Sequence, residues 1–152
     1  MVGGGRRGLA LARELTSEGH AVRAVTRTEG RRAEIEAAGC ECWIGDPDRI
    51  GTLRYALDNV TVLLWLLGTA SGPAGRVAAL HGARLRMMLD KTADTTVRGV
   101  VYELGTPEGV AEMEHARATN EIPFTLLEAD RSDVENWSAA ALGAIDAVLA
   151  LR

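Results

Sequence analysis

The sequence predicts an α/β domain in which a doubly wound parallel sheet is covered by helices on both faces. Three observations support this fold class. Short apolar runs typical of strands alternate with helical segments along the whole chain. The run at residues 60–67 is apolar on both faces, as expected for a strand buried in a parallel sheet. A glycine-rich turn near the N-terminus leads directly into a helical stretch.

The glycine-rich turn spans residues 3–8 and has the spacing G-x-G-x-x-G. A helix is expected from residue 9, ending near Gly19, and an apolar strand follows at 20–26. In this motif Gly3 permits a tight turn, Gly5 lets the backbone approach a pyrophosphate, and Gly8 lets the helix pack on the sheet. Arg6 and Arg7 are candidates for further pyrophosphate contacts, with one of them expected to point to solvent. The turn therefore predicts a nicotinamide dinucleotide site.

The first strand is unusually short. Only Met1 and Val2 precede the first glycine, whereas a strand in the middle of a sheet normally has about five residues. Either the strand is a stub or the polypeptide begins upstream of Met1. We favour truncation or a misplaced start as the hypothesis.

The rest of the pattern predicts four more strands and five more helices. The strands are expected at 40–44, 60–67, 97–103 and 123–128, and the helices at 29–38, 48–57, 76–91, 107–119 and from a capping box at 132–135. Six strands that alternate with helices predict a three-layer Rossmann sheet of order 3-2-1-4-5-6 with a clipped first strand. We expect a single domain over residues 1–152.

Composition excludes several functional classes. The net charge of −4 and the aromatic content of 4% argue against nucleic-acid binding. With no long apolar run and no signal peptide, we expect a cytoplasmic protein without a membrane segment. We interpret Cys40 and Cys42 as small core residues. The three histidines fall in separate predicted elements, so no metal site is predicted.

The second strand indicates which nucleotide binds. An NAD-binding fold usually ends this strand with a carboxylate that holds the ribose 2′-hydroxyl. Arg27 occupies the equivalent place here, and Arg31 and Arg32 follow. Because an arginine can hold the 2′-phosphate through two hydrogen bonds, we predict NADP as the cofactor, with NAD as the alternative.

Three stretches carry a resemblance to a known family. They are the turn and helix at 3–20, the segment Gly45-Asp46 with the apolar residues up to Val60, and the strand 100–102. These stretches resemble atypical members of the short-chain dehydrogenase/reductase superfamily and the nucleotide-binding part of NAD-dependent epimerases and dehydratases. Potassium-channel regulatory nucleotide domains share the first two stretches. The resemblance implies that the fingerprint glycines line the pyrophosphate, that Asp46 faces the adenine, and that Gly68 and Thr69 lie under the cofactor ribose.

The catalytic chemistry of that superfamily has no counterpart in the sequence. Its enzymes use a Tyr-x-x-x-Lys pair, in which lysine lowers the tyrosine pKa. Lys91 is the only lysine, and residues 59 and 106, four positions after Tyr55 and Tyr102, are Asn and Thr. The polar residues expected at the carboxyl ends of the strands are Thr69, Ser71, Glu103, Thr106, Glu128 and Asp130. We expect structural roles for these residues, and the sequence assigns no catalytic residue.

Three functions remain open. The first is an NADP-binding or sensing protein, or a degenerate reductase. The second is an active oxidoreductase or epimerase-like enzyme that uses a non-standard acid or a partner subunit. The third is a channel-gating type of regulatory module, which the basic Arg27 disfavours. A homodimer is expected on base rates alone, because core packing explains the apolar stripes of the helices at 76–91 and after 132. The substrate is not identified.

Overall fold

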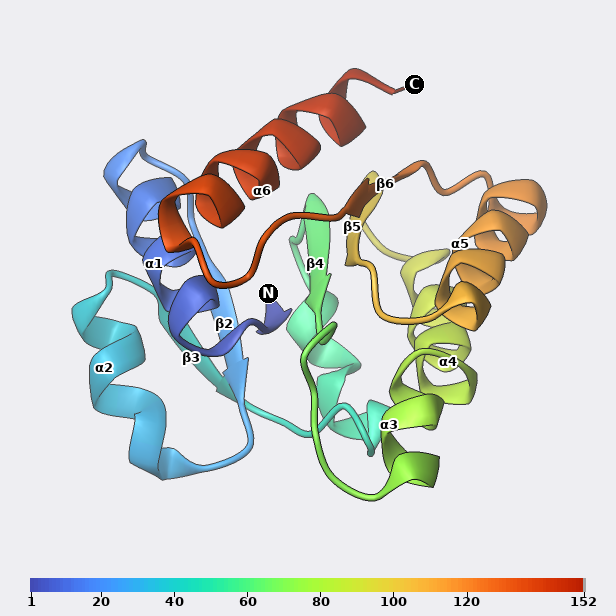
Figure 1. The fold of residues 1–152 in the computed structure, drawn as a ribbon, viewed down its shortest axis with the longest axis horizontal. Helices are drawn as coiled ribbons and strands as arrows, with labels where there is room; N and C mark the ends of the chain where they lie inside the picture. The colour runs from blue at the N-terminus through green and yellow to red at the C-terminus, as the bar shows by residue number, and fades with distance from the viewer. Residues whose placement is uncertain (152) are drawn as a thin grey trace.

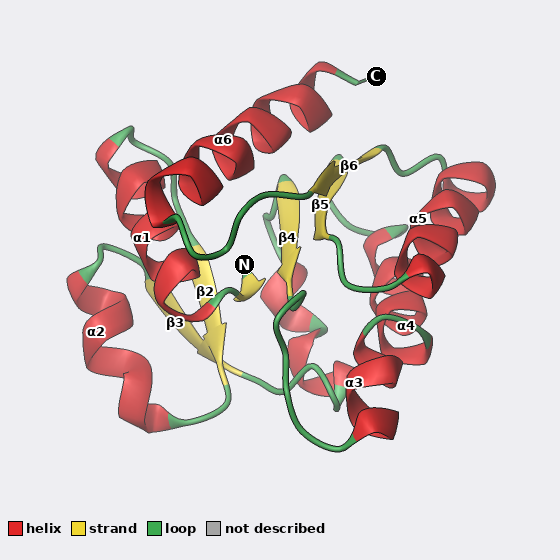
Figure 2. Ribbon diagram, viewed as in Figure 1, coloured by secondary structure: helices red, strands yellow, loops and turns green. Residues whose placement is uncertain are grey.

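The computed structural model describes residues 1–151 and contains one six-stranded sheet. Every strand pair is parallel, and the order β3-β2-β1-β4-β5-β6 confirms the predicted topology (Figures 1 and 2). The strands are β1 Val2–Gly3, β2 Arg23–Thr26, β3 Glu41–Ile44, β4 Val62–Leu66, β5 Gly99–Glu103 and β6 Phe124–Leu127.

Helices cover both faces of the sheet. On one face lie α1 Gly5–Ser17, α2 Arg32–Ala37 and α6 Val134–Ala150, and on the other lie α3 Ala74–Leu80, α4 Ala83–Thr92 and α5 Pro107–Asn120. The predicted apolar stripe of the last helix is buried in the chain's own core, where Trp137 has no exposed surface. Cys40 and Cys42 are buried free thiols beneath α1 and α2, as predicted.

The short first strand predicted from the sequence is confirmed. β1 has two residues and joins the two halves of the sheet, because Val2 pairs with Val25 of β2 and with Trp65 of β4. The Met1 carbonyl extends this ladder by accepting the Val25 N–H at 3.0 Å. Val2 is only 2% exposed, so even this short strand contributes to the centre of the core.

The helix predicted at 48–57 is wrong. Two short 3-10 segments occupy this stretch, η2 Ile50–Leu53 and η3 Tyr55–Leu57. The apolar side chains expected to face the core are buried there, so the periodicity was correctly identified. The Thr52 carbonyl accepts the indole N–H of Trp43 at 2.9 Å, which diverts it from an α-helical bond to the following turn. A contact from β3 thus accompanies the tighter backbone geometry.

The single helix predicted at 76–91 is also wrong, because the chain breaks between α3 and α4 at His81 and Gly82. The Leu80 carbonyl accepts the indole N–H of Trp65 at 3.0 Å instead of an N–H from the next helical turn. The His81 ring turns into the core and is 2% exposed. Tertiary hydrogen bonds therefore override a continuous helical pattern.

The predicted capping box of the last helix is wrong in its position. Asp133, rather than Ser132, caps α6, and its carboxylate accepts the Asn136 N–H at 3.2 Å. Ser132 instead donates its hydroxyl to Asp130 at 2.6 Å and closes the preceding turn. The start of α5 agrees with the sequence, since Pro107 is its first residue after the cap Thr106.

Among residues 1–151, no helix combines the length and the apolar character needed to cross a membrane.

Candidate nucleotide-binding site

A cavity of about 460 Å³ lies at the carboxyl ends of β1 to β4. Its walls are the glycine turn, the end of β2, the loop after β3, the loop after β4 and helix α3. The strand order reverses between β1 and β4, which makes this the topological switch point of the sheet. Ligands of open α/β sheets bind in the crevice at this point.

The glycine turn is closely packed at Gly3 and Gly8 and open at Gly5. Gly3 has a φ of +81°, and a Cβ added there would lie 2.4 Å from the Leu66 carbonyl oxygen. A Cβ on Gly8 would lie 2.9 Å from the Gly3 carbonyl oxygen, so both positions need glycine for close packing. Gly5 has no neighbour within 4 Å of an added Cβ, and it lines the cavity. Its backbone is therefore open to a ligand.

Helix α1 begins beside the cavity without a side-chain cap. Gly4 occupies the cap position, and the first turn contains no acidic residue. The first N–H groups of a helix have no partner within the helix, and they lie at the positive end of its dipole. This helix terminus can therefore receive phosphate oxygens.

Charge in the cavity has one sign. Arg27, Arg31 and Arg76 line it, and none of its described lining residues is acidic. Arg31 forms an ion pair with Glu34, and Arg76 forms one with Asp48, whereas Arg27 is exposed at the end of β2. The lining is suited to an anionic ligand.

The cavity brings together four of the predicted cofactor contacts, namely Gly3, Gly5, Arg27 and Thr69, and Ser71 lines it as well. Gly8 packs against Gly3 of the turn, and Gly68 packs against Arg131 and Glu103. Asp46 stands outside the lining, where its carboxylate accepts the Asp48 N–H at 2.9 Å, although Gly45 and Pro47 on either side of it do line the cavity.

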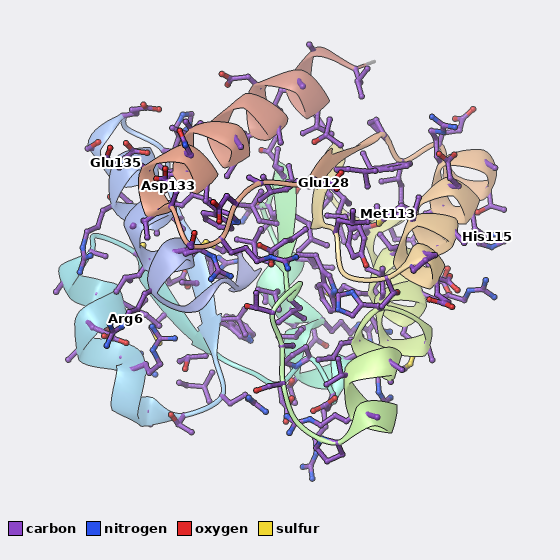
Figure 3. All side chains as sticks on the ribbon, in the orientation of Figure 1. Arg6, Met113, His115, Glu128, Asp133 and Glu135 are labelled. Atoms are coloured by element: carbon purple, nitrogen blue, oxygen red, sulfur yellow. The ribbon has the colours of Figure 1, made fainter. Side chains whose placement is uncertain are left out.

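The two arginines of the glycine turn differ in position. Arg6 is exposed, and Figure 3 shows its side chain toward α2. The side chain of Arg7 is 17% exposed and turns the other way, donating to the Thr69 hydroxyl at 3.0 Å. One of the pair therefore faces solvent, as expected, and neither lines the cavity.

A buried carboxylate lies at the end of β5. Glu103 is 1% exposed, and its two oxygens accept the Gly68 N–H at 2.8 Å and the Trp137 indole N–H at 2.9 Å. Arg7 and Arg131 approach the same carboxylate to within 3.8 and 3.6 Å. We refer to Arg7, Gly68, Glu103, Arg131 and Trp137 as the Glu103 cluster.

Sequence reasoning placed Glu103 at a strand end but missed this cluster. Its members come from the glycine turn, β5, the loops after β4 and β6, and helix α6. The Arg7 guanidinium also lies 5.3 Å from the centre of the Trp137 ring, and its buried Nε has no hydrogen-bond partner among the described residues. The ring face partly compensates this orphaned donor through a cation–π contact. No local pattern in the sequence signals such a convergence.

Behind the cavity, His81 and Tyr102 form a buried pair. The His81 Nε2 lies 3.1 Å from the Leu67 carbonyl, which can only accept, so Nε2 carries the proton and Nδ1 accepts the Tyr102 hydroxyl at 2.7 Å. Burial lowers the pKa of His81 and raises the pKa of Tyr102. Tyr102 is fully buried and does not line the cavity, so it is poorly placed to exchange a proton with a ligand.

Comparisons with solved structures show the same fold. The chain is similar to a triphenylmethane reductase from Citrobacter sp. complexed with NADP(H), at 20% identity and a TM-score of 0.58, over 82% of this chain and 46% of that one. It is also similar to the NADPH-dependent quinone oxidoreductase QOR2 from Escherichia coli, at 17% identity and a TM-score of 0.55, over 82% and 44% of the two chains.

A third similar structure is the UDP-glucuronic acid 4-epimerase of Bacillus cereus in complex with NAD, at 12% identity and a TM-score of 0.62, over 82% and 54% of the two chains. The chain thus spans about half the length of these three structures. No curated protein sequence matches it.

A family model matches more than half of the chain. Residues 1–85, which extend from β1 into α4, match the TrkA-N domain. This segment contains the glycine turn, Arg27 and all the strand ends around the cavity. The chain therefore belongs to the TrkA-N domain family, and it is an NAD(P)-binding Rossmann domain.

Proposed function

We propose that this protein is a single-domain module that binds NADP in preference to NAD and uses the nucleotide as a bound ligand rather than as a hydride carrier. The observation that carries the proposal is the cavity at the switch point, lined by three arginines and, among the described residues, by no carboxylate. A site for the unphosphorylated ribose of NAD would offer an acidic partner to its 2′-hydroxyl.

The glycine turn would hold the pyrophosphate. Gly5 faces open space, and the uncapped start of α1 offers free N–H groups. Gly3 and Gly8 would act indirectly, by allowing the turn to pack against β4 and against itself. Thr69, which lines the cavity and accepts a hydrogen bond from Arg7, is the proposed ribose contact. Gly68 would set its position, and Asp46 stays our prediction for the adenine side.

Arg27 would hold the 2′-phosphate. It follows β2 directly and reaches the cavity from an exposed position, so little else constrains its guanidinium. A charge-assisted contact of about 1.5–3 kcal/mol corresponds to about a 10- to 150-fold preference for NADP over NAD.

Catalysis by the usual proton donor of this fold is disfavoured. Tyr102 is buried and bonded to His81, and Lys91 is the only lysine in the chain. The competing function is an active reductase. Two of the similar structures are the precedent, a triphenylmethane reductase complexed with NADP(H) and an NADPH-dependent quinone oxidoreductase. NADPH oxidation that depends on an added quinone would favour the reductase and overturn the ligand-binding proposal.

Calorimetric titration with NADPH and NADH tests the nucleotide assignment. We expect NADPH to bind at least about tenfold more tightly than NADH, and Arg27→Ala to remove most of the difference. Arg98→Ala is the matched control, because Arg98 is also exposed but precedes β5 at the opposite end of the strands. Equal binding of the two nucleotides by the native protein, or an unchanged preference in Arg27→Ala, would refute the role of Arg27.

A further inference from the structure

The nucleotide cavity ends at the loop after β4 and does not reach the carboxyl ends of β5 and β6. Every described residue that lines the cavity belongs to the segment 2–80. The strands β5 and β6 and the helices α5 and α6 contribute none. In a doubly wound sheet each half of the fold holds one mononucleotide, with the β4 to β6 half serving the second one. The cavity therefore covers the adenosine half, the pyrophosphate and only the β4 edge of the second half, where the end of β4, the loop after it and helix α3 line it.

The Glu103 cluster occupies the part of the second half that lies at the end of β5. Glu103 stands at the carboxyl end of β5, where the second mononucleotide would lie. Figure 1 shows the segment between β6 and α6 crossing from β6 toward the start of α1. This segment carries Arg131, which donates to the Leu104 carbonyl at 2.6 Å and approaches Glu103 to within 3.6 Å. Arg7 closes the cluster from the side of the glycine turn.

Two glycines in this region have no room for a methyl group. A Cβ added to Gly68 would lie 2.4 Å from Arg131 and 2.7 Å from Glu103. A Cβ added to Gly105, in the loop after β5, would lie 2.2 Å from the His81 ring. A planar ring the size of nicotinamide could take the place of the cluster at the end of β5 only if the Glu103 carboxylate lost its donors. That separation is costly, because it would leave a buried charge without partners.

We propose that the site recognises the 2′-phosphoadenosine diphosphate part of NADP and leaves the nicotinamide ring in solvent. This inference rests on the function proposed above and adds which part of the nucleotide is bound. Arg27 and the glycine turn supply the two anion contacts, and both lie on the open side of the cleft. The Glu103 cluster excludes the ring from the other side.

A site of this kind cannot distinguish oxidised from reduced nucleotide. NADP⁺ and NADPH differ only in the nicotinamide ring, which would make no contact with the protein. The protein would therefore respond to the total concentration of 2′-phosphorylated adenosine dinucleotides, and hydride transfer within the folded site would not occur.

Calorimetric titration of the native protein with NADP⁺, NADPH and 2′-phospho-ADP-ribose tests the inference. The third compound keeps the adenosine, the 2′-phosphate, the diphosphate and the second ribose but lacks nicotinamide. We expect the three dissociation constants to agree within about fivefold. A dissociation constant at least about fivefold lower for either dinucleotide than for 2′-phospho-ADP-ribose would overturn the inference, because the ring would then contribute to binding.

The fluorescence of bound NADPH gives a second readout. A ring in solvent keeps the emission of free NADPH, whereas a blue-shifted and enhanced emission would place the ring in a protein pocket and overturn the inference. Arg27→Ala tests the 2′-phosphate contact separately from the ring, since it should weaken all three ligands by the same factor. If NADH bound as tightly as NADPH, the proposed 2′-phosphate contact would fail instead, whatever the ring contributes.

Discussion

At the scale of single residues, Glu103 is the side chain on which most of the site depends. Its carboxylate is buried at the end of β5 and is held by two N–H donors and two arginines. A carboxylate in this position costs desolvation free energy, and its partners offset that cost only while all of them are in place. It joins the glycine turn to the last helix through contacts that no short stretch of sequence contains.

Glu103→Gln should lower the free energy of unfolding by about 2–3 kcal/mol, because it leaves the two arginines without their counter-charge and turns an amide toward one of the N–H donors. Urea denaturation followed by circular dichroism measures the change. Glu128→Gln is the control, since Glu128 is exposed near the end of the neighbouring strand β6. Equal midpoints for the two variants would show that the cluster contributes little to stability.

His81 makes the stability of the protein depend on pH. Burial holds the pKa of its imidazole below the ordinary value of 6.5, so the folded state favours the neutral ring. Below pH 6.5 the unfolded chain binds the proton more readily than the folded one, and the contribution of His81 to stability is lost as pH falls.

Urea midpoints of the native protein should therefore drop more steeply between about pH 7 and pH 5 than those of His81→Gln. His115→Gln is the matched control, because His115 is exposed on α5. A native protein and a His81→Gln variant with parallel pH profiles would rule out this contribution.

At the scale of the elements, the sequence correctly predicted the sheet and its strand order. The backbone conformation of residues 48–57 and 76–91 became clear only from the structure. Both wrong helices share one feature, since an indole N–H from a strand donates to a carbonyl within each stretch. Trp43 and Trp65 lie in strands, and their partners lie in later segments. Apolar periodicity reports which side chains are buried, but it does not report which carbonyls are taken by tertiary hydrogen bonds.

Replacing a glycine by alanine should have opposite effects on stability in the glycine turn and in α6. Gly3→Ala should destabilise the protein by at least about 2 kcal/mol, because the new Cβ would meet the Leu66 carbonyl oxygen at 2.4 Å from a backbone with a φ of +81°. Gly143→Ala within α6 should stabilise it by about 0.5–1 kcal/mol, because no atom lies within 4 Å of the new Cβ. Thermal denaturation of both variants tests the contrast, and two shifts of the same sign would contradict it.

At the scale of the whole molecule, the two halves of the sheet have unequal roles. The β1 to β4 side forms the cavity, and the β5 to β6 side supplies the packed cluster that borders it. The segment that matches the TrkA-N domain ends at residue 85 and contains the whole cavity lining. The later segment thus supports the nucleotide site from behind.

Nucleotide binding should stabilise the whole domain by mass action. At a concentration of one hundred times its dissociation constant, NADPH should raise the free energy of unfolding by about 2.7 kcal/mol. For a chain of this size that corresponds to a rise in Tm of about 5–10 °C. NADP⁺ at the same multiple of its own dissociation constant should give the same shift. A Tm that does not respond to saturating nucleotide would mean that the folded domain binds neither form.

The sequence by itself determined the fold class, the strand order, the short first strand and the position of Arg27 after β2. These features depend on local periodicity and on glycine spacing, which short stretches of chain contain in full. Only the tertiary structure decided that Arg7 turns inward while Arg6 faces solvent, that α3 and α4 are separate, and that Glu103 collects its donors. Those outcomes depend on hydrogen bonds and charges between residues that are distant in the chain and meet only when the sheet forms, and local patterns carry no information about such contacts.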